Sequence, residues 1–171
     1  MFKIVILAGN FTRDTCGLEE MKVGACFVNP KKRIVGTGYN GMPNNCSNRL
    51  LPWGKDKRDD SKLGAKDYYV CHAEMNGVIN RFSADLDGCT IYVSLFPCNE
   101  CAKIIIQSGI KEVVYYSDKK NDKEEVEAAK ILFEEARVKT RQYDRRKRMK
   151  VEVDFESIEA EPQPRKRARK E

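Results

Sequence analysis

The feature that most constrains how this chain folds is a pair of short motifs built around its only histidine. His72 and Glu74 form the first motif, and Pro97, Cys98 and Cys101 form the second. A catalytic zinc ion takes three protein ligands, often imidazole and thiolate groups, and keeps a fourth position open for water. His72, Cys98 and Cys101 supply such a set, so the fold has to bring these three side chains to one point.

The elements around the two motifs predict how the ligands meet. Residues 70–82 carry apolar side chains near helical spacing, and residues 98–108 start after a proline and stop at a glycine, as helices do. The β-branched and aromatic run at 90–95 predicts a strand between these helices. A Cys-x-x-Cys pair at a helix N-terminus directs both thiolates to one point, where backbone N–H groups favour their negative charge.

The rest of the chain continues the alternation of strands and helices. Because helices and strands are interleaved and no repeat is present, the pattern favours one domain with an α/β/α layered fold. The further expected elements are a hairpin of strands at 23–29 and 33–39, a loop at 38–48, an exposed connection at 51–66, a strand at 112–116, an amphipathic helix at 123–138 and a last strand at 150–155.

The position of Glu74 adds a chemical role to the metal set. It lies two residues after His72 and is not needed as a ligand, so it can move a proton from water to a ring nitrogen and then to leaving ammonia. A bound zinc ion would lower the pKa of that water toward about 7. A Cys-x-x-Cys pair alone is more often a structural zinc half-site or a redox pair. Together with the His-x-Glu motif and the helix–strand–helix order, it is typical of zinc nucleobase deaminases.

The cysteine count bears on the compartment of the protein. Seven cysteines at uneven spacing do not resemble a secreted disulfide framework. The apolar run at 4–8 is too short for a signal peptide and reads as a buried strand, and no apolar run is long enough to span a membrane. We therefore expect a cytoplasmic protein without membrane association. The remaining thiols are expected in the core or in loops: Cys16, Cys26, Cys46, Cys71 and Cys89.

The net charge of +6 is concentrated at the end of the chain. Residues 165–170 (RKRARK) follow a stretch that reads as disordered, so we assign 156–171 as a disordered basic tail. Two interpretations of the tail stay open: a nuclear-localisation or nucleic-acid patch, and a solubilising segment. No aromatic residue is interleaved in the tail to stack on bases, which argues against a nucleic-acid partner.

Several segments in unbroken order resemble the deoxycytidylate (dCMP) deaminases of the cytidine-deaminase superfamily. The zinc motif indicates only the superfamily, whereas the GYNGMP loop, LPW and the FPCNECAK context are specific to the dCMP branch. The resemblance is carried by VGAC (23–26), GTGYNGMPNNCS (36–47), LPW (51–53), YVCHAEMN (69–76) and SLFPCNECAKIIIQSGIKEVVYYSDK (94–119).

The resemblance implies a three-layer α/β/α cytidine-deaminase-like fold with a central mixed sheet. It implies a zinc-dependent hydrolase that converts dCMP to dUMP and ammonia for thymidylate synthesis, as a homohexamer activated by dCTP and inhibited by dTTP. It identifies His72, Cys98 and Cys101 as zinc ligands and Glu74 as the catalytic proton shuttle.

Two further residues are implied as substrate-binding. Asn40 occupies the position that contacts the nucleoside, and Arg141 falls near an arginine that binds the phosphate. The competing interpretations are a turn residue held by its own backbone hydrogen bonds for Asn40, and part of a solvated basic run for Arg141.

The chain also departs from the family pattern. Residues 1–22 show little of the usual long helix and polar turn, so we separate this atypical N-terminal segment from a deaminase domain at 23–155. Asn45 and Arg137 stand where glycine is common, and Lys120 replaces a common tyrosine. The alternative functions are a polynucleotide cytidine or adenosine deaminase and a catalytically impaired interaction subunit of a deaminase oligomer.

Overall fold

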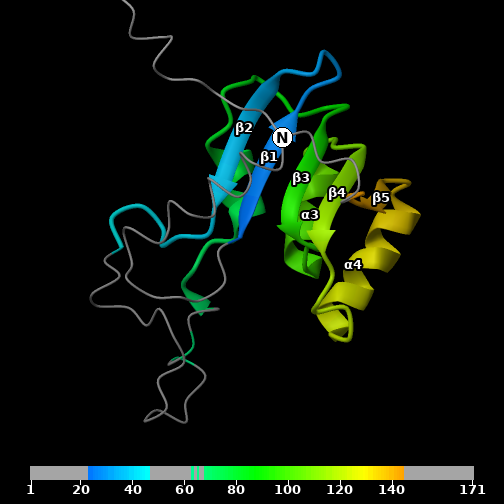
Figure 1. The fold of residues 1–171 in the computed structure, drawn as a ribbon. Helices are drawn as coiled ribbons and strands as arrows, with labels where there is room; N and C mark the ends of the chain where they lie inside the picture. Colours follow the sequence, from blue (N-terminus) through cyan, green and yellow to red (C-terminus); the bar gives the residue numbers. More distant parts are fainter. Residues whose placement is uncertain (1–22, 47–62, 64, 66–67, 145–171) are drawn as a thin grey trace, which may run out of the picture.

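The computed structural model describes residues 23–46, 63, 65 and 68–144, and they form a mixed five-stranded sheet with three helices (Figure 1). The strand order is β2-β1-β3-β4-β5; β1 is antiparallel to β2 and β3, while β3, β4 and β5 are parallel. The elements are β1 (Gly24–Val28), β2 (Ile34–Tyr39), α2 (Ala73–Ile79), β3 (Thr90–Leu95), α3 (Asn99–Gln107), β4 (Glu112–Ser117), α4 (Glu124–Glu135) and β5 (Lys139–Gln142).

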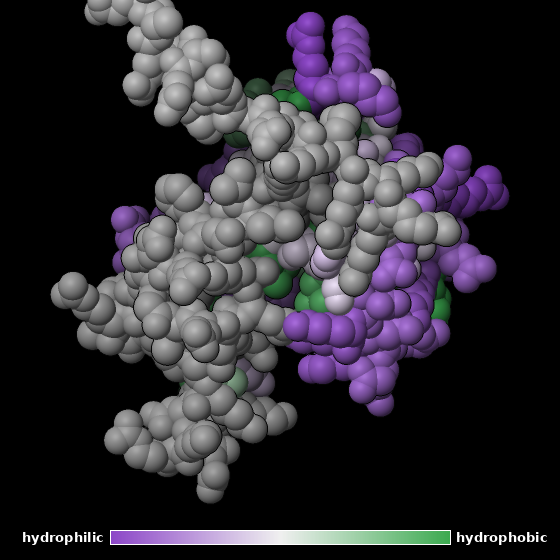
Figure 2. All heavy atoms as spheres, in the orientation of Figure 1, coloured by the Kyte–Doolittle hydropathy of each residue, from purple (hydrophilic) through white to green (hydrophobic). Residues whose placement is uncertain are grey.

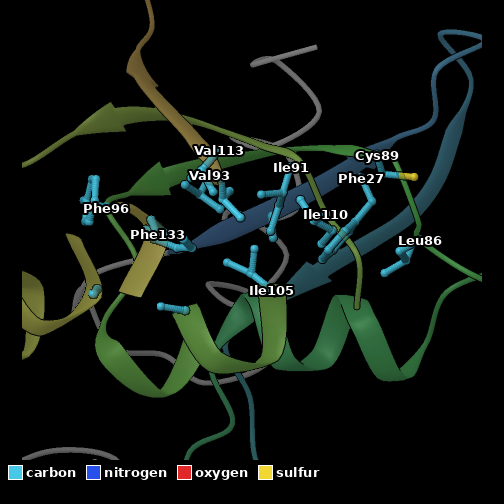
Figure 3. Close-up of a cluster of buried hydrophobic side chains, with 14 of the residues drawn as sticks. Phe27, Leu86, Cys89, Ile91, Val93, Phe96, Ile105, Ile110, Val113 and Phe133 are labelled. Carbon is cyan, nitrogen blue, oxygen red and sulfur yellow. The ribbon is translucent and has the colours of Figure 1, made fainter. Parts of the chain in front are cut away.

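Side chains alternate between the two faces of the sheet, as strand geometry requires. On one face, Phe27, Ile91 and Val113 belong to the main core together with residues of all three helices. Figure 3 shows these side chains filling the space between the sheet and the helices. On the other face, Cys26 and Val114 form a smaller cluster with partly buried tyrosines. Burial raises the pKa of the Cys26 thiol to about 11, so this cysteine is a core residue, as its sequence context predicts.

The predicted α/β class and the central mixed sheet are confirmed. The hairpin, the strands at 90–95 and 112–116 and all three predicted helices are present, but the helix predicted at 70–82 is shorter and spans only Ala73–Ile79. In the described part of the chain, the helices contribute to the core on one face of the sheet, so these residues do not test the third layer. No helix among them is long and apolar enough to cross a membrane.

Strand β5 has no counterpart in the sequence-based prediction. Its residues KTRQ are all exposed and carry no apolar alternation, because β5 is an edge strand whose backbone pairs with β4. The last strand predicted at 150–155, the segment 1–22, the tail 156–171 and most of the 51–66 connection lie outside the described residues.

The two positions at which this chain replaces a common glycine, Asn45 and Arg137, both have an unusual backbone conformation. Asn45 has a φ of 65° and Arg137 has a φ of 54°, both in the left-handed region that glycine adopts without strain. Asparagine tolerates this region better than most residues. Arg137 directly follows the C-cap of α4, a position where helices commonly end on a left-handed glycine, so here arginine accepts the strained conformation.

Helix α2 lies unusually close to β2, and glycines permit the contact. A Cβ atom on Gly38 would overlap the carbonyl oxygen of Ala73 and lie 2.8 Å from the Cα of Gly77. A Cβ atom on Gly77 would overlap the ring of Phe27. This backbone-to-backbone packing fixes the position of α2, and therefore of the residues at its N-terminus.

We expect the substitution Gly38→Ala to lower the free energy of unfolding by about 3 kcal/mol, because the helix backbone cannot move aside without disturbing the core. Gly41→Ala is the matched control, since its Cβ would meet only ordinary contacts, the nearest at 3.7 Å. Urea unfolding monitored by circular dichroism measures both. Equal stabilities for the two variants would contradict the role of the close contact.

Candidate active site

The three predicted ligands lie at the N-termini of two helices. His72 is the N-cap of α2, Cys98 is the N-cap of α3, and Cys101 lies in the first turn of α3. The Nδ1 atom of His72 is 3.3 Å from the sulfur of Cys101 and 3.4 Å from that of Cys98. All three ligand atoms lie within 4.8 Å of one another, so the fold brings this set together.

The arrangement fits a tetrahedral zinc ion. Nitrogen and sulfur ligands at their usual distances from zinc, with a tetrahedral angle between them, are about 3.5 Å apart. The two nitrogen–sulfur distances agree with this value to within a few tenths of an ångström. One imidazole and two thiols form a catalytic donor set because they leave a fourth position for water.

The two sulfur atoms differ in their affinity for protons. An interaction with the side chain of Cys101 lowers the pKa of Cys98 to about 3. The same interaction, together with burial, raises the pKa of Cys101 far above its usual value. Zinc binds thiolates, so metal binding at this pair releases the protons that the thiols carry.

Glu74 lies in the first turn of α2, beside the metal ligands. It is 3% exposed, and among the described residues it is the one charged side chain that is buried. Burial raises the pKa of its carboxyl group, and the group also forms a hydrogen bond with Cys101. A carboxyl group with a raised pKa next to a metal site can both accept and return a proton near neutral pH.

His72, Glu74 and Cys98 line a pocket of about 310 Å³ at one end of the strands of the sheet. The start of β1 and the segments that follow β2, β3 and β4 meet at this end, where crevices of open α/β sheets bind ligands. The lining residues are Val23, Asn40, Val70, His72, Ala73, Glu74, Leu95, Phe96, Cys98, Asn99, Glu100, Lys120, Lys123, Glu125 and Val126.

Asn40 lies in the pocket wall, near the predicted catalytic residues. Its Oδ1 atom accepts a hydrogen bond of 3.0 Å from the backbone N–H of Val23. The side chain therefore ties the end of β2 to the start of β1 instead of bonding within its own turn. This contact holds Asn40 at the pocket and fixes the orientation of its amide group.

Arg141 is not brought together with the other predicted residues. It lies on β5, and its Nε donates to Oε1 of Glu112 at 2.8 Å, while Thr90 donates to the other oxygen of Glu112. Burial opposes the charge of Glu112, but Arg141 lowers the pKa of this carboxyl group overall. Thr90 and Glu112 begin β3 and β4, whereas the pocket follows the ends of these strands. The phosphate-binding role of Arg141 stays a prediction.

The pocket contains two basic residues that the sequence did not predict as site residues, Lys120 and Lys123. The signal was present as a lysine in place of a common tyrosine after β4. The sequence could not show that this lysine lines a pocket, because lysines are common in exposed turns and the position of the turn depends on the fold.

The buried carboxyl group beside a His/Cys/Cys set, on helices that cover a mixed sheet, defines a zinc-dependent deaminase. Residues 6–117 match the family model described as "Cytidine and deoxycytidylate deaminase zinc-binding region". The chain belongs to this family.

Curated relatives and solved structures agree with this assignment. The chain is 55% identical to deoxycytidylate deaminase of Mus musculus and 52% identical to that of Homo sapiens. Each match covers 82% of this chain and 78% of the relative. The crystal structure of dCMP deaminase from cyanophage S-TIM5 in complex with dCMP and dUMP aligns with a TM-score of 0.58. It covers 82% of this chain and 95% of that chain at 22% identity, which supports the fold.

We expect Cys101→Ser to lose zinc and the stability that zinc confers, because the substitution removes one of two thiolate ligands, the buried one. Zinc content by atomic absorption and thermal unfolding with and without chelator measure this. Free zinc at 1,000 times its dissociation constant stabilises the folded protein by about 4 kcal/mol, and the variant should show almost none of this gain. The control is Cys46→Ser, which changes an exposed thiol. Full zinc binding by Cys101→Ser would contradict the ligand assignment.

Proposed function

We propose that this protein catalyses the zinc-dependent hydrolysis of dCMP to dUMP and ammonia. The observation that carries this proposal is the buried Glu74 carboxyl group next to the His72, Cys98 and Cys101 set, inside a pocket large enough for a pyrimidine nucleotide. The identity of 52–55% with deoxycytidylate deaminases supports dCMP as the substrate.

The metal contributes one element of the chemistry: bound zinc lowers the pKa of water toward about 7, so that hydroxide forms at neutral pH. His72, Cys98 and Cys101 hold the metal. Glu74 accepts the proton that the water loses and donates it to the ring nitrogen next to the amino-bearing carbon. The water oxygen bonds to the amino-bearing carbon. The same carboxyl group then takes the remaining proton of that oxygen and moves it to the amino group, so that the carbon–nitrogen bond breaks and ammonia leaves.

The environment of Glu74 suits this alternating role. A fully exposed carboxylate is a weak base at neutral pH and does not retain a proton long enough to deliver it. Burial raises the pKa of Glu74 and makes the protonated form accessible between the two transfers. The carboxyl group thus serves first as general base and then as general acid.

Asn40 is proposed to position the nucleoside. Its Oδ1 atom is held by the Val23 N–H, so the orientation of the amide is fixed, and the Nδ2 group can donate to a sugar hydroxyl in the pocket. We include Asn40 as a substrate-binding residue on the strength of this contact.

Assembly, regulation and location extend the proposal. From the family resemblance we propose a homohexamer activated by dCTP and inhibited by dTTP. We also propose a cytoplasmic location, with the basic tail at 156–171 as a candidate nuclear-localisation signal. Analytical ultracentrifugation and activity assays with added dCTP or dTTP address the first two points.

Zinc-loaded protein is expected to release ammonia from dCMP, and much less from deoxycytidine or single-stranded oligonucleotides. A coupled glutamate dehydrogenase assay follows the ammonia. Preferential turnover of oligonucleotides would favour a polynucleotide deaminase. A folded, zinc-loaded protein that deaminates none of these would refute the proposed activity and favour a role as an interaction subunit.

We expect Glu74→Gln to lower kcat for dCMP by roughly 10²–10⁴-fold, because the amide can neither accept nor return the proton. Zinc content should stay unchanged, since Glu74 is not among the predicted ligands. Glu135→Gln, at an exposed carboxylate near the end of α4, is the matched control and should retain activity. If Glu74→Gln retains zinc and turns over dCMP at the wild-type rate, the proton-transfer role is wrong.

A further inference from the structure

The turn between β4 and α4 forms one wall of the active-site pocket. Lys120 and Lys123 both line the pocket, and the backbone N–H of Lys123 donates to the carbonyl oxygen of Lys120 at 3.1 Å. This hydrogen bond closes the turn and directs two lysines from one short segment to the same cavity. In Figure 1 the turn lies at the same lower edge of the sheet as the end of β3.

The opposite side of the pocket belongs to the reaction. His72, Glu74 and Cys98 come from the N-termini of α2 and α3, and Asn40 follows β2. Because β1 and β3 separate β2 from β4 in the sheet, the lysine-bearing turn lies across the pocket from Asn40. The pocket therefore has a reacting side and a basic side, which corresponds to the two ends of a nucleotide.

Acidic residues near the lysines are partly engaged elsewhere. Glu100 of α3 also lines the pocket, and its carboxylate pairs with Lys103 at 2.6 Å. Glu127 in the first turn of α4 pairs with Lys130 at 3.2 Å. Glu125 of α4 also lines the pocket, beside Lys120 and Lys123. Figure 2 shows that hydrophilic side chains dominate the visible surface over α4.

We propose that Lys123, together with Lys120, binds the 5′-phosphate of the substrate and makes this enzyme select a nucleotide over a nucleoside; this inference rests on the proposed function. A phosphate monoester carries a charge of about −1.5 to −2 at neutral pH, and an ammonium group binds it as a compact point charge. Lys123 is the principal ligand because its side chain is exposed to incoming substrate at the first position before α4. The phosphate lies far from the reacting carbon, so its contacts contribute equally to the ground state and the transition state.

The test compares Lys123→Met with Lys119→Met in the full-length, zinc-loaded protein. Lys119 carries the same charge in the same turn but does not line the pocket. Lys123→Met should raise KM for dCMP about tenfold or more with little change in kcat, which is the signature of lost uniform binding. The double variant at Lys120 and Lys123 should raise KM further. Lys119→Met should behave like the wild-type protein.

The inhibition constant of dUMP supplies an independent readout. It should rise in parallel with KM for Lys123→Met, whereas inhibition by deoxyuridine should not change, because deoxyuridine has no phosphate. Circular dichroism and zinc content establish that each variant is folded and loaded.

The outcomes separate this inference from the function on which it rests. Wild-type turnover of dCMP together with an unchanged KM in Lys123→Met overturns the phosphate assignment and leaves the proposed function intact. A raised KM in Arg141→Met but not in Lys123→Met also overturns it, because the phosphate then binds on β5. Absence of dCMP turnover in the wild-type protein refutes the proposed function, and the phosphate assignment falls with it.

Discussion

The convergence of two helix N-termini on one point is the constraint on which the rest of this structure depends. His72 caps α2 and Cys98 caps α3, and their ligand atoms approach within 3.4 Å. Neither helix can shift by one residue without removing a ligand from the set. The close contact between Gly38 and Gly77 holds α2 against the sheet, and the core residues beneath α3 hold the second helix. Packing far from the metal thus determines the geometry of the metal ligands.

The same convergence explains how a carboxyl group can be buried beside a proton-binding thiol. Glu74 lies in the first turn of α2 and points into the interior, whereas His72, the N-cap of the same helix, stays exposed. Removal of Glu74 from water is costly unless polar groups compensate, and Cys101 and its own backbone provide hydrogen bonds. Burying this carboxyl group lowers the stability of the fold, but the raised pKa that results suits the proton transfer proposed for Glu74. The burial of the first turn of α2 therefore suits both the packing of the helix and the proposed reaction.

Sequence alone predicted the parts of this protein in which local pattern and chemistry agree. The single histidine, the cysteine spacing and the strand between them predicted the metal set. Composition predicted β3, the flanking proline and glycine predicted α3, and an amphipathic pattern predicted α4, all close to their observed limits. It did not predict β5, because the KTRQ segment pairs through its backbone and carries no side-chain signal. It also gave no indication that Arg141 pairs with Glu112 or that Lys123 faces the pocket. Both facts depend on strand order and register, which no local pattern encodes.

The left-handed conformation of Arg137 has a consequence for the stability of this chain. Helix α4 ends there, and a residue with a Cβ pays about 1 kcal/mol or more for a conformation that glycine adopts freely. Such a cost is tolerable only when the surrounding fold holds a reserve of stability. The buried core that joins α4 to the sheet provides that reserve through Val126, Ala129 and Phe133. The end of this helix is therefore a place where a single glycine would relieve backbone strain without any change in the path of the chain.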